Sequence, residues 1–129
     1  LNRLLKIPHL WAIHSISSEN LYAKLCRHNS LPNLFLEVNT AKEPQKEGFK
    51  DESEIRDCLK KYPQINPMGL MTLGKIGDEA KCFQRLIEIR NHLNVDWKLS
   101  MGMSDSYLEA QKLGSDWVRV GSALFSLDK

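Results

Sequence analysis

Short apolar runs alternate with longer amphipathic stretches along the whole chain, and this alternation limits the possible folds more than any other feature of the sequence. The runs with the length of strands are residues 10–16, 34–39, 69–73, 98–101 and 117–121. The stretches with helical spacing are residues 18–28, 51–62, 78–93 and 105–113, and residues 2–7 read as part of another helix. Strands and helices in such alternation are typical of repeated βα units with a parallel sheet. We therefore predict an α/β fold whose helices cover the outside of the strands.

Composition places the chain among ordinary globular proteins. Its 129 residues are 42% hydrophobic and 26% charged, which fits a single domain over residues 1–129. Charges of both signs are intermixed and the net charge is only +2, so we expect neither a nucleic-acid partner nor a membrane surface as partner. No apolar run reaches the roughly 18 residues of a transmembrane helix and no secretory leader is visible, so we expect a cytoplasmic protein.

The three cysteines give a hint about the compartment. Cys26, Cys58 and Cys82 are far apart and none forms a Cys-x-x-Cys pair. This spacing favours neither a disulfide framework nor a zinc site. We expect free thiols in a reducing environment.

The longest irregular segment, residues 40–50, follows the second predicted strand. It is polar and contains Pro44 and Gly48. In a fold of βα units, a loop after a strand is more often functional than a loop before one. We therefore single this segment out as a candidate functional loop.

Strand parity places two charged side chains on the face opposite the helices. Trp117, Arg119 and Gly121 share one face of the last run, and Phe35 and Glu37 share the corresponding face of the second run. Burying an unpaired charge is costly, so Arg119 and Glu37 each need a partner or a ligand. The alternative is that the two pair with each other or lie at a hydrated strand end. The apolar side chains expected inside an incomplete barrel are those of Phe35, Met71 and Met101.

Two corners that combine glycine with serine follow the last two predicted strands. One is Gly102-Met103-Ser104 and the other is Gly121-Ser122. Glycine lets the backbone approach a ligand closely, and a serine hydroxyl beside free backbone N–H groups suits an anion. Phosphate often lies between the loops after the last two strands of a parallel barrel. The alternative is ordinary helix capping by Ser104 together with a tight glycine turn.

Four longer strings carry a resemblance to a known family. They are IHSI at residues 13–16, LEVNTAKEPQKEGF at 36–49, GLMTLG at 69–74 and LSMGMSDSYLEAQKLGSDWVRVGSALF at 99–125. Together they resemble the pyridoxal phosphate homeostasis protein family, whose fold is similar to the N-terminal barrel domain of alanine racemase. The likeness covers nearly the whole chain, and MGMSD and VRVGSALF are its most specific parts. It implies a (βα)8 TIM-type barrel that binds pyridoxal 5′-phosphate (PLP) at the C-terminal ends of its strands and serves intracellular PLP homeostasis.

Residue by residue, the resemblance implies a phosphate seat at the two corners. Ser104, Gly121 and Ser122 would hold the phosphate, and Met103 would line the pocket. The family more often has threonine at the position of Ser122, and serine keeps the hydroxyl. These four positions are therefore expected to bind the cofactor.

The resemblance also implies the surroundings of the cofactor ring. Arg119 would lie against the pyridine nitrogen, and His14 would border the ring; a histidine that simply packs at a strand end is the alternative for His14. A charged guanidinium keeps the ring nitrogen unprotonated and weakens the ring as an electron sink. We therefore expect cofactor binding without strong catalysis. The alternatives are a racemase-like PLP enzyme and an inert phosphate-binding barrel fragment.

The chain departs from the family in one respect. The family's lysine that forms a Schiff base with PLP lies on the first barrel strand, and the resemblance places this chain over the last five strands only. No lysine here matches the missing one, and neither Lys46 nor Lys75 is expected to be catalytic. Five strands cannot close as eight do. We expect self-association, or a missing N-terminal segment that completes the barrel.

Overall fold

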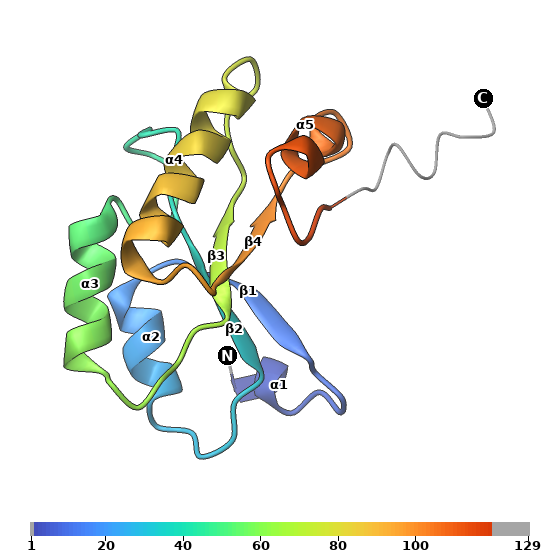
Figure 1. Ribbon diagram of the computed structural model, residues 1–129. Coiled ribbons are helices and arrows are strands. Elements are labelled where there is room, and N and C mark those ends of the chain that lie inside the picture. Colours follow the sequence, from blue (N-terminus) through green and yellow to red (C-terminus); the bar gives the residue numbers. More distant parts are fainter. Residues whose placement is uncertain (1, 120–129) are drawn as a thin grey trace.

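Residues 2–119 are the part of the chain that the computed structural model describes, and they form a parallel sheet with helices packed against it (Figure 1). The elements in chain order are α1 (Asn2–Leu5), β1 (Ala12–Ile16), α2 (Glu19–Leu25), β2 (Asn33–Glu37), α3 (Glu52–Lys61), β3 (Gly69–Thr72), α4 (Glu79–Leu93), β4 (Lys98–Met101) and α5 (Tyr107–Lys112). The strands pair in parallel in the order β1-β2-β3-β4. The predicted alternation and the parallel sheet are confirmed. None of the helices between residues 2 and 119 is long and apolar enough to cross a membrane.

The described half of the fifth predicted strand, residues 117–119, is not a regular strand. Trp117 forms only an isolated parallel bridge to Ser100, while Val120 and Gly121 lie outside the described residues. Backbone hydrogen bonds still join this segment to β4, because the Trp117 N–H donates to the Leu99 carbonyl and the Met101 N–H donates to the Trp117 carbonyl, both at 3.1 Å. Side chains add to this pairing: the Leu99 N–H donates to the Asp116 carboxylate at 2.8 Å, and the Met101 N–H also reaches the Ser115 hydroxyl at 3.3 Å. The apolar pattern alone could not reveal these side-chain contacts.

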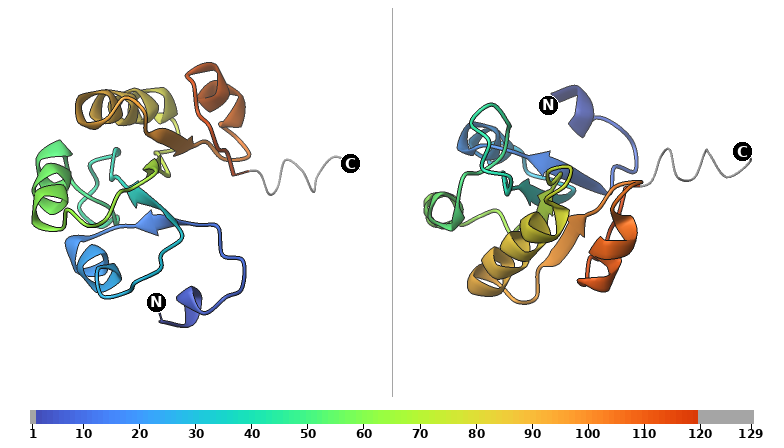
Figure 2. Two further views of the ribbon diagram at one scale, coloured as in Figure 1. Left: turned by 60° about the horizontal axis from the view of Figure 1, so that its bottom comes forward. Right: turned by 90° about the horizontal axis from the view of Figure 1, so that it is seen from above.

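One face of the sheet forms the main core with the helices. In both views of Figure 2, α2, α3 and α4 lie together on that side. The sheet contributes alternate side chains such as Leu34, Leu36 and Leu99, and the helices contribute Tyr22 and Phe83, all of them buried. Alternation along a strand sends the intervening residues to the opposite face.

An irregularity in β1 breaks this alternation. Ile13 pairs with Leu34 and Ile16 with Leu36, so three steps on β1 match two steps on β2. One extra residue therefore lies between the two isoleucines, as in a β-bulge. Both isoleucines reach the helix-covered core, and His14 between them faces the other way.

A side-chain contact between the two outer strands shows that the sheet is strongly curved. His14 Nδ1 of β1 lies 2.9 Å from Ser100 Oγ of β4. In a flat sheet, strands three spacings apart would be separated by about 14 Å. The concave face is therefore filled from both edges, as expected for part of a barrel. Met101 was expected inside this concavity, but it packs in the helix-side core and Ser100 takes the inward position.

Candidate functional site

Arg119 lies on the concave face, as strand parity predicts. Its Nη1 donates to Ser100 Oγ at 3.3 Å and its Nη2 donates to the Thr72 carbonyl at 3.1 Å. Its Nε is buried and has no hydrogen-bond partner among the described residues. An N–H group buried in this way costs free energy unless something accepts it. The guanidinium thus donates to two acceptors and still offers its Nε–H to a third.

Glu37 faces the same concavity and interacts electrostatically with Arg119. Burial raises the pKa of Glu37, the neighbouring Glu47 raises it further, and Arg119 opposes both. Burial lowers the pKa of Arg119, and Glu37 opposes that shift. An arginine starts so far above neutrality that it stays charged. Of the two interpretations of these charges, simple pairing is the weaker, because the hydrogen bonds of Arg119 go to Ser100 and Thr72.

His14 sits among aromatic rings. It stacks on Phe35 with ring centroids 4.2 Å apart, and it meets Trp117 edge-on at 6.2 Å. Trp117 in turn lies 5.0 Å from Trp11. Burial lowers the pKa of His14, and the charge of Arg119 lowers it further. The predicted neighbours His14 and Arg119 are therefore brought together, joined through Ser100.

The first glycine-serine corner follows β4. Gly102 has a φ of 104°, a conformation that favours glycine, and its carbonyl accepts from the Arg119 N–H at 2.9 Å. Met103 is 43% exposed and Ser104 is half-buried. The alternative in which Ser104 caps the next helix is wrong, because the N-cap of α5 is Ser106.

The second corner, Gly121-Ser122, lies outside the described residues. Its predicted meeting with the Ser104 corner therefore stays a prediction. The backbone bond between Gly102 and Arg119 does bring the chain just before that corner alongside the end of β4.

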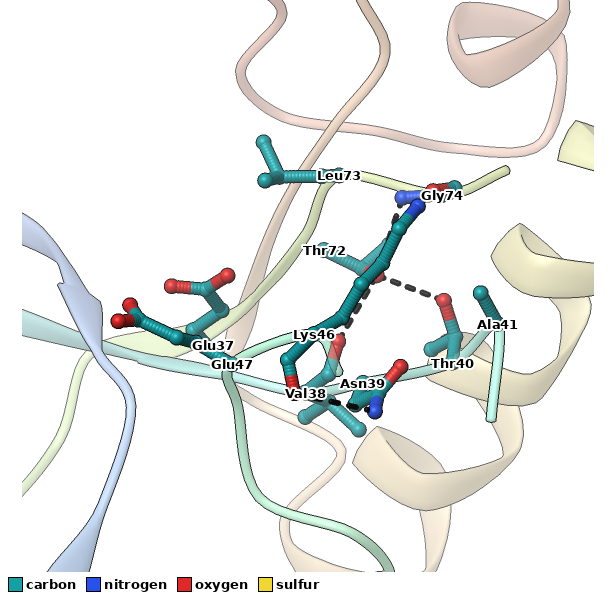
Figure 3. Close-up of a pocket in the computed structure, with 10 residues that line it drawn as sticks. All are labelled: Glu37, Val38, Asn39, Thr40, Ala41, Lys46, Glu47, Thr72, Leu73 and Gly74. Carbon is teal, nitrogen blue, oxygen red and sulfur yellow. Dashed lines mark hydrogen bonds between the residues drawn. The ribbon is translucent and has the colours of Figure 1, made fainter. Parts of the chain in front are cut away.

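A pocket of about 220 Å³ lies where β2 and β3 end, beside the loop over residues 40–50 (Figure 3). Thr40 and Thr72 share a hydrogen bond of 2.6 Å between their hydroxyls, and Lys46 reaches over the pocket to donate to the Gly74 carbonyl at 3.3 Å. Asn39 Oδ1 is buried there without a partner among the described residues. The loop was singled out from the sequence, whereas the threonines were missed. The available signal was a threonine near the C-terminal end of each of two neighbouring strands: Thr72 is the last residue of β3, and Thr40 follows the end of β2.

The sequence matches the family model "Alanine racemase, N-terminal domain" over residues 3–129. Curated relatives named "Pyridoxal phosphate homeostasis protein" include those of Schizosaccharomyces pombe (35% identical over 95% of this chain), Pseudomonas aeruginosa (34% over 91%) and Homo sapiens (30% over 96%). The chain spans 58%, 56% and 53% of these proteins, respectively.

Two solved structures give the same result for the fold. PipY of Synechococcus elongatus PCC7942, solved without PLP, is 29% identical with a TM-score of 0.76, over 96% of this chain and 66% of that one. Alanine racemase of Corynebacterium glutamicum is 17% identical with a TM-score of 0.64, over 88% of this chain and 34% of that one. The second likeness concerns the fold alone.

Proposed function

Because the chain belongs to the alanine racemase N-terminal domain family, we propose that it binds pyridoxal 5′-phosphate as part of a protein that maintains the supply of this cofactor in the cell. The observation that supports this most is the buried Arg119 Nε, which has no partner among residues 2–119. The names of its relatives point to the same cofactor.

The residues around Arg119 fit the ring of this cofactor. The Nε–H is a donor without an acceptor, and an unprotonated pyridine nitrogen is an acceptor of the right polarity. When bound, PLP supplies a reactive aldehyde on an aromatic ring that can withdraw electrons. A permanently charged arginine beside the nitrogen keeps that nitrogen unprotonated and limits the withdrawal. This favours holding the cofactor over strong catalysis, and we place His14 at the border of the ring.

We assign the phosphate to the two glycine-serine corners. Ser104 would donate its hydroxyl, Gly121 and Ser122 would complete the seat, and Met103 would line it. The backbone hydrogen bond between Gly102 and Arg119 supports this assignment, because it joins the first corner to the segment that leads into the second.

The open edge of the sheet also supports a partner that completes the barrel. Among the described residues, β1 pairs on one side only, with β2, so its other edge is open to a further strand. A second copy of the chain, or a longer polypeptide that supplies the remaining strands, would cover this edge. The covalent lysine of the family would come from that part. In this chain the cofactor would be held without a covalent bond.

A cofactor analogue that lacks the aldehyde tests this proposal directly. Titration with 4′-deoxypyridoxine 5′-phosphate, followed by quenching of tryptophan fluorescence, reports binding without reaction at surface lysines. Trp117 is close enough to the site to respond. Arg119→Gln should weaken binding about tenfold or more, because a hydrogen bond to a charged group contributes about 1.5–3 kcal/mol. Arg56→Gln, on an exposed face of α3, is the matched control.

The phosphate seat has its own control. Ser104→Ala should weaken binding of the phosphorylated analogue and leave binding of 4′-deoxypyridoxine unchanged, because only the former carries the phosphate. Equal affinity of the unaltered chain for the two compounds would refute the assignment of the corners. Equal losses in Arg119→Gln and Arg56→Gln would refute the role of Arg119.

A further inference from the structure

Three side chains form a continuous line across the concave face. Ser100 stands in the middle, with its Oγ 2.9 Å from His14 Nδ1 and 3.3 Å from Arg119 Nη1. Ser100 is almost fully buried, with 1% of its surface exposed. His14 and Ser100 are 86 residues apart in the sequence and belong to the two outer strands of the sheet. The line therefore connects both edges of the sheet to the guanidinium.

Hydrogen-bond polarity assigns the proton positions along this line. A guanidinium can only donate, so Ser100 Oγ accepts from Arg119. A serine hydroxyl has a single proton, and a buried one needs an acceptor. His14 Nδ1 is the partner within reach for that proton among the hydrogen bonds of the described residues. Nδ1 is therefore unprotonated, and the proton of the neutral imidazole is on Nε2.

We propose that neutral His14, acting through Ser100, orients Arg119, so that protonation of His14 releases the guanidinium and lets the site lose its ligand. In the part that concerns the ligand, this rests on the proposed function, whose regulation it describes. Ser100 and His14 are positioning residues here, because both act through Arg119.

The charges that face His14 all bear on this switch. From residues 117–119 comes the cation Arg119, and β4 contributes the uncharged Ser100. From β2 come the stacked ring of Phe35 and, one pleat further, the carboxylate of Glu37, whose electrostatic partner is Arg119. Protonated His14 would put a second cation on the hydroxyl that already accepts from Arg119. Repulsion between the two cations, and the reversed hydrogen bond from His14 to Ser100, would then both weaken the hydrogen bond between Arg119 and Ser100.

Acid should therefore disturb the site in a defined range. Burial and Arg119 both lower the pKa of His14 below its usual value of about 6.5. Between that lowered pKa and about 6.5, the unfolded chain binds more protons than the folded one, so the folded arrangement loses stability as the pH falls. Above this range His14 is neutral in both states. Within it, folded His14 is still mostly neutral, and the line is lost as the pH falls through the lowered pKa.

Nitrogen-15 NMR of the ligand-free chain tests the arrangement without any cofactor. We expect His14 as the Nε2–H tautomer, with a pKa below the usual value of about 6.5 for an imidazole. Ser100→Ala should remove the tautomer preference and raise the pKa of His14, whereas Ser100→Thr, which keeps the hydroxyl, should restore both. An Nδ1–H tautomer of His14 in the unaltered chain would overturn the proposal.

A second experiment, the ligand arm of the test, measures the affinity for 4′-deoxypyridoxine 5′-phosphate at pH values between about 5 and 8. His14→Gln is the informative variant, because its amide oxygen can accept from Ser100 and never titrates. The unaltered chain should lose several-fold more affinity towards acid than His14→Gln, and His28→Gln should behave like the unaltered chain. The difference between variants cancels the titration of the ligand's own phosphate.

The two arms separate the possible failures. The predicted tautomer with equal acid profiles for the unaltered chain and His14→Gln would overturn the switch. The predicted tautomer in a chain that fails to bind the analogue at any pH would overturn the proposed function, while the NMR result would still support the line from His14 to Arg119.

Discussion

Replacing Phe35 by alanine tests whether the concave face is enclosed. The Phe35 side chain is fully buried, with 0% exposure, beneath the rings of His14 and Trp117. Truncating a buried phenylalanine to alanine costs about 3–5 kcal/mol, through lost apolar burial and the cavity left behind. With a urea m-value of about 2 kcal/mol per M, the unfolding midpoint of Phe35→Ala should fall by about 1.5–2.5 M. Circular dichroism during urea titration measures this.

The control is a similar truncation where nothing encloses the side chain. Ile76 is 86% exposed, and Ile76→Ala should change the free energy of unfolding by less than about 0.5 kcal/mol. A second readout is specific to the site: uncovering His14 should raise its pKa, because burial is the main cause that lowers it. A loss below about 1 kcal/mol in Phe35→Ala, with an unchanged m-value, would show that the rings do not enclose this face.

Two further changes test other parts of the structure. Thr72→Val keeps the shape of a side chain that is 1% exposed but leaves the Thr40 hydroxyl without its 2.6 Å partner, so it should cost about 1–3 kcal/mol in urea unfolding. Thr72→Ser, which keeps the hydroxyl, should lower the free energy of unfolding clearly less. An unchanged free energy of unfolding in Thr72→Val would contradict the role of the hydrogen bond between the two threonines. Hydrogen bonds from Arg56 and His92 lower the pKa of Glu52, so the stability it contributes is present above the unfolded pKa of about 4.3 and is lost as the pH falls through the folded pKa. Glu52→Gln should therefore flatten the decline in melting temperature at acidic pH, and identical acid profiles would disprove this.

The fold could be predicted from the sequence because its signals are local. A parallel strand buried on both faces appears in the sequence as a short apolar run, and a helix appears as apolar residues three or four positions apart. The inward direction of Trp117 and Arg119 follows from a period of two residues and is confirmed by their contacts with His14 and Ser100. The sequence pattern could not decide whether Ser104 or Ser106 is the N-cap residue, because both serines precede the same helix.

The resemblance placed His14 and Arg119 near each other, but the contacts that join them could not be predicted, because they depend on curvature. The contact between His14 and Ser100 exists because the sheet bends until its edges approach each other. No pairing preference or spacing encodes a contact across 86 residues. The unpaired Arg119 Nε is equally hidden, since a missing partner becomes visible only when all neighbours are in place.

The irregularity in β1 decides which side chains this strand sends to each face. At its present length, a strand that paired without the irregularity would point Ile13 and Ile16 to opposite faces. Either the imidazole would then leave the concavity or an isoleucine would enter it. Deleting Ser15 would instead let the strand pair regularly, with both isoleucines on one face and His14 on the other. A related sequence that is one residue shorter here can therefore keep the same inward histidine, and a gap at this position is compatible with the same fold.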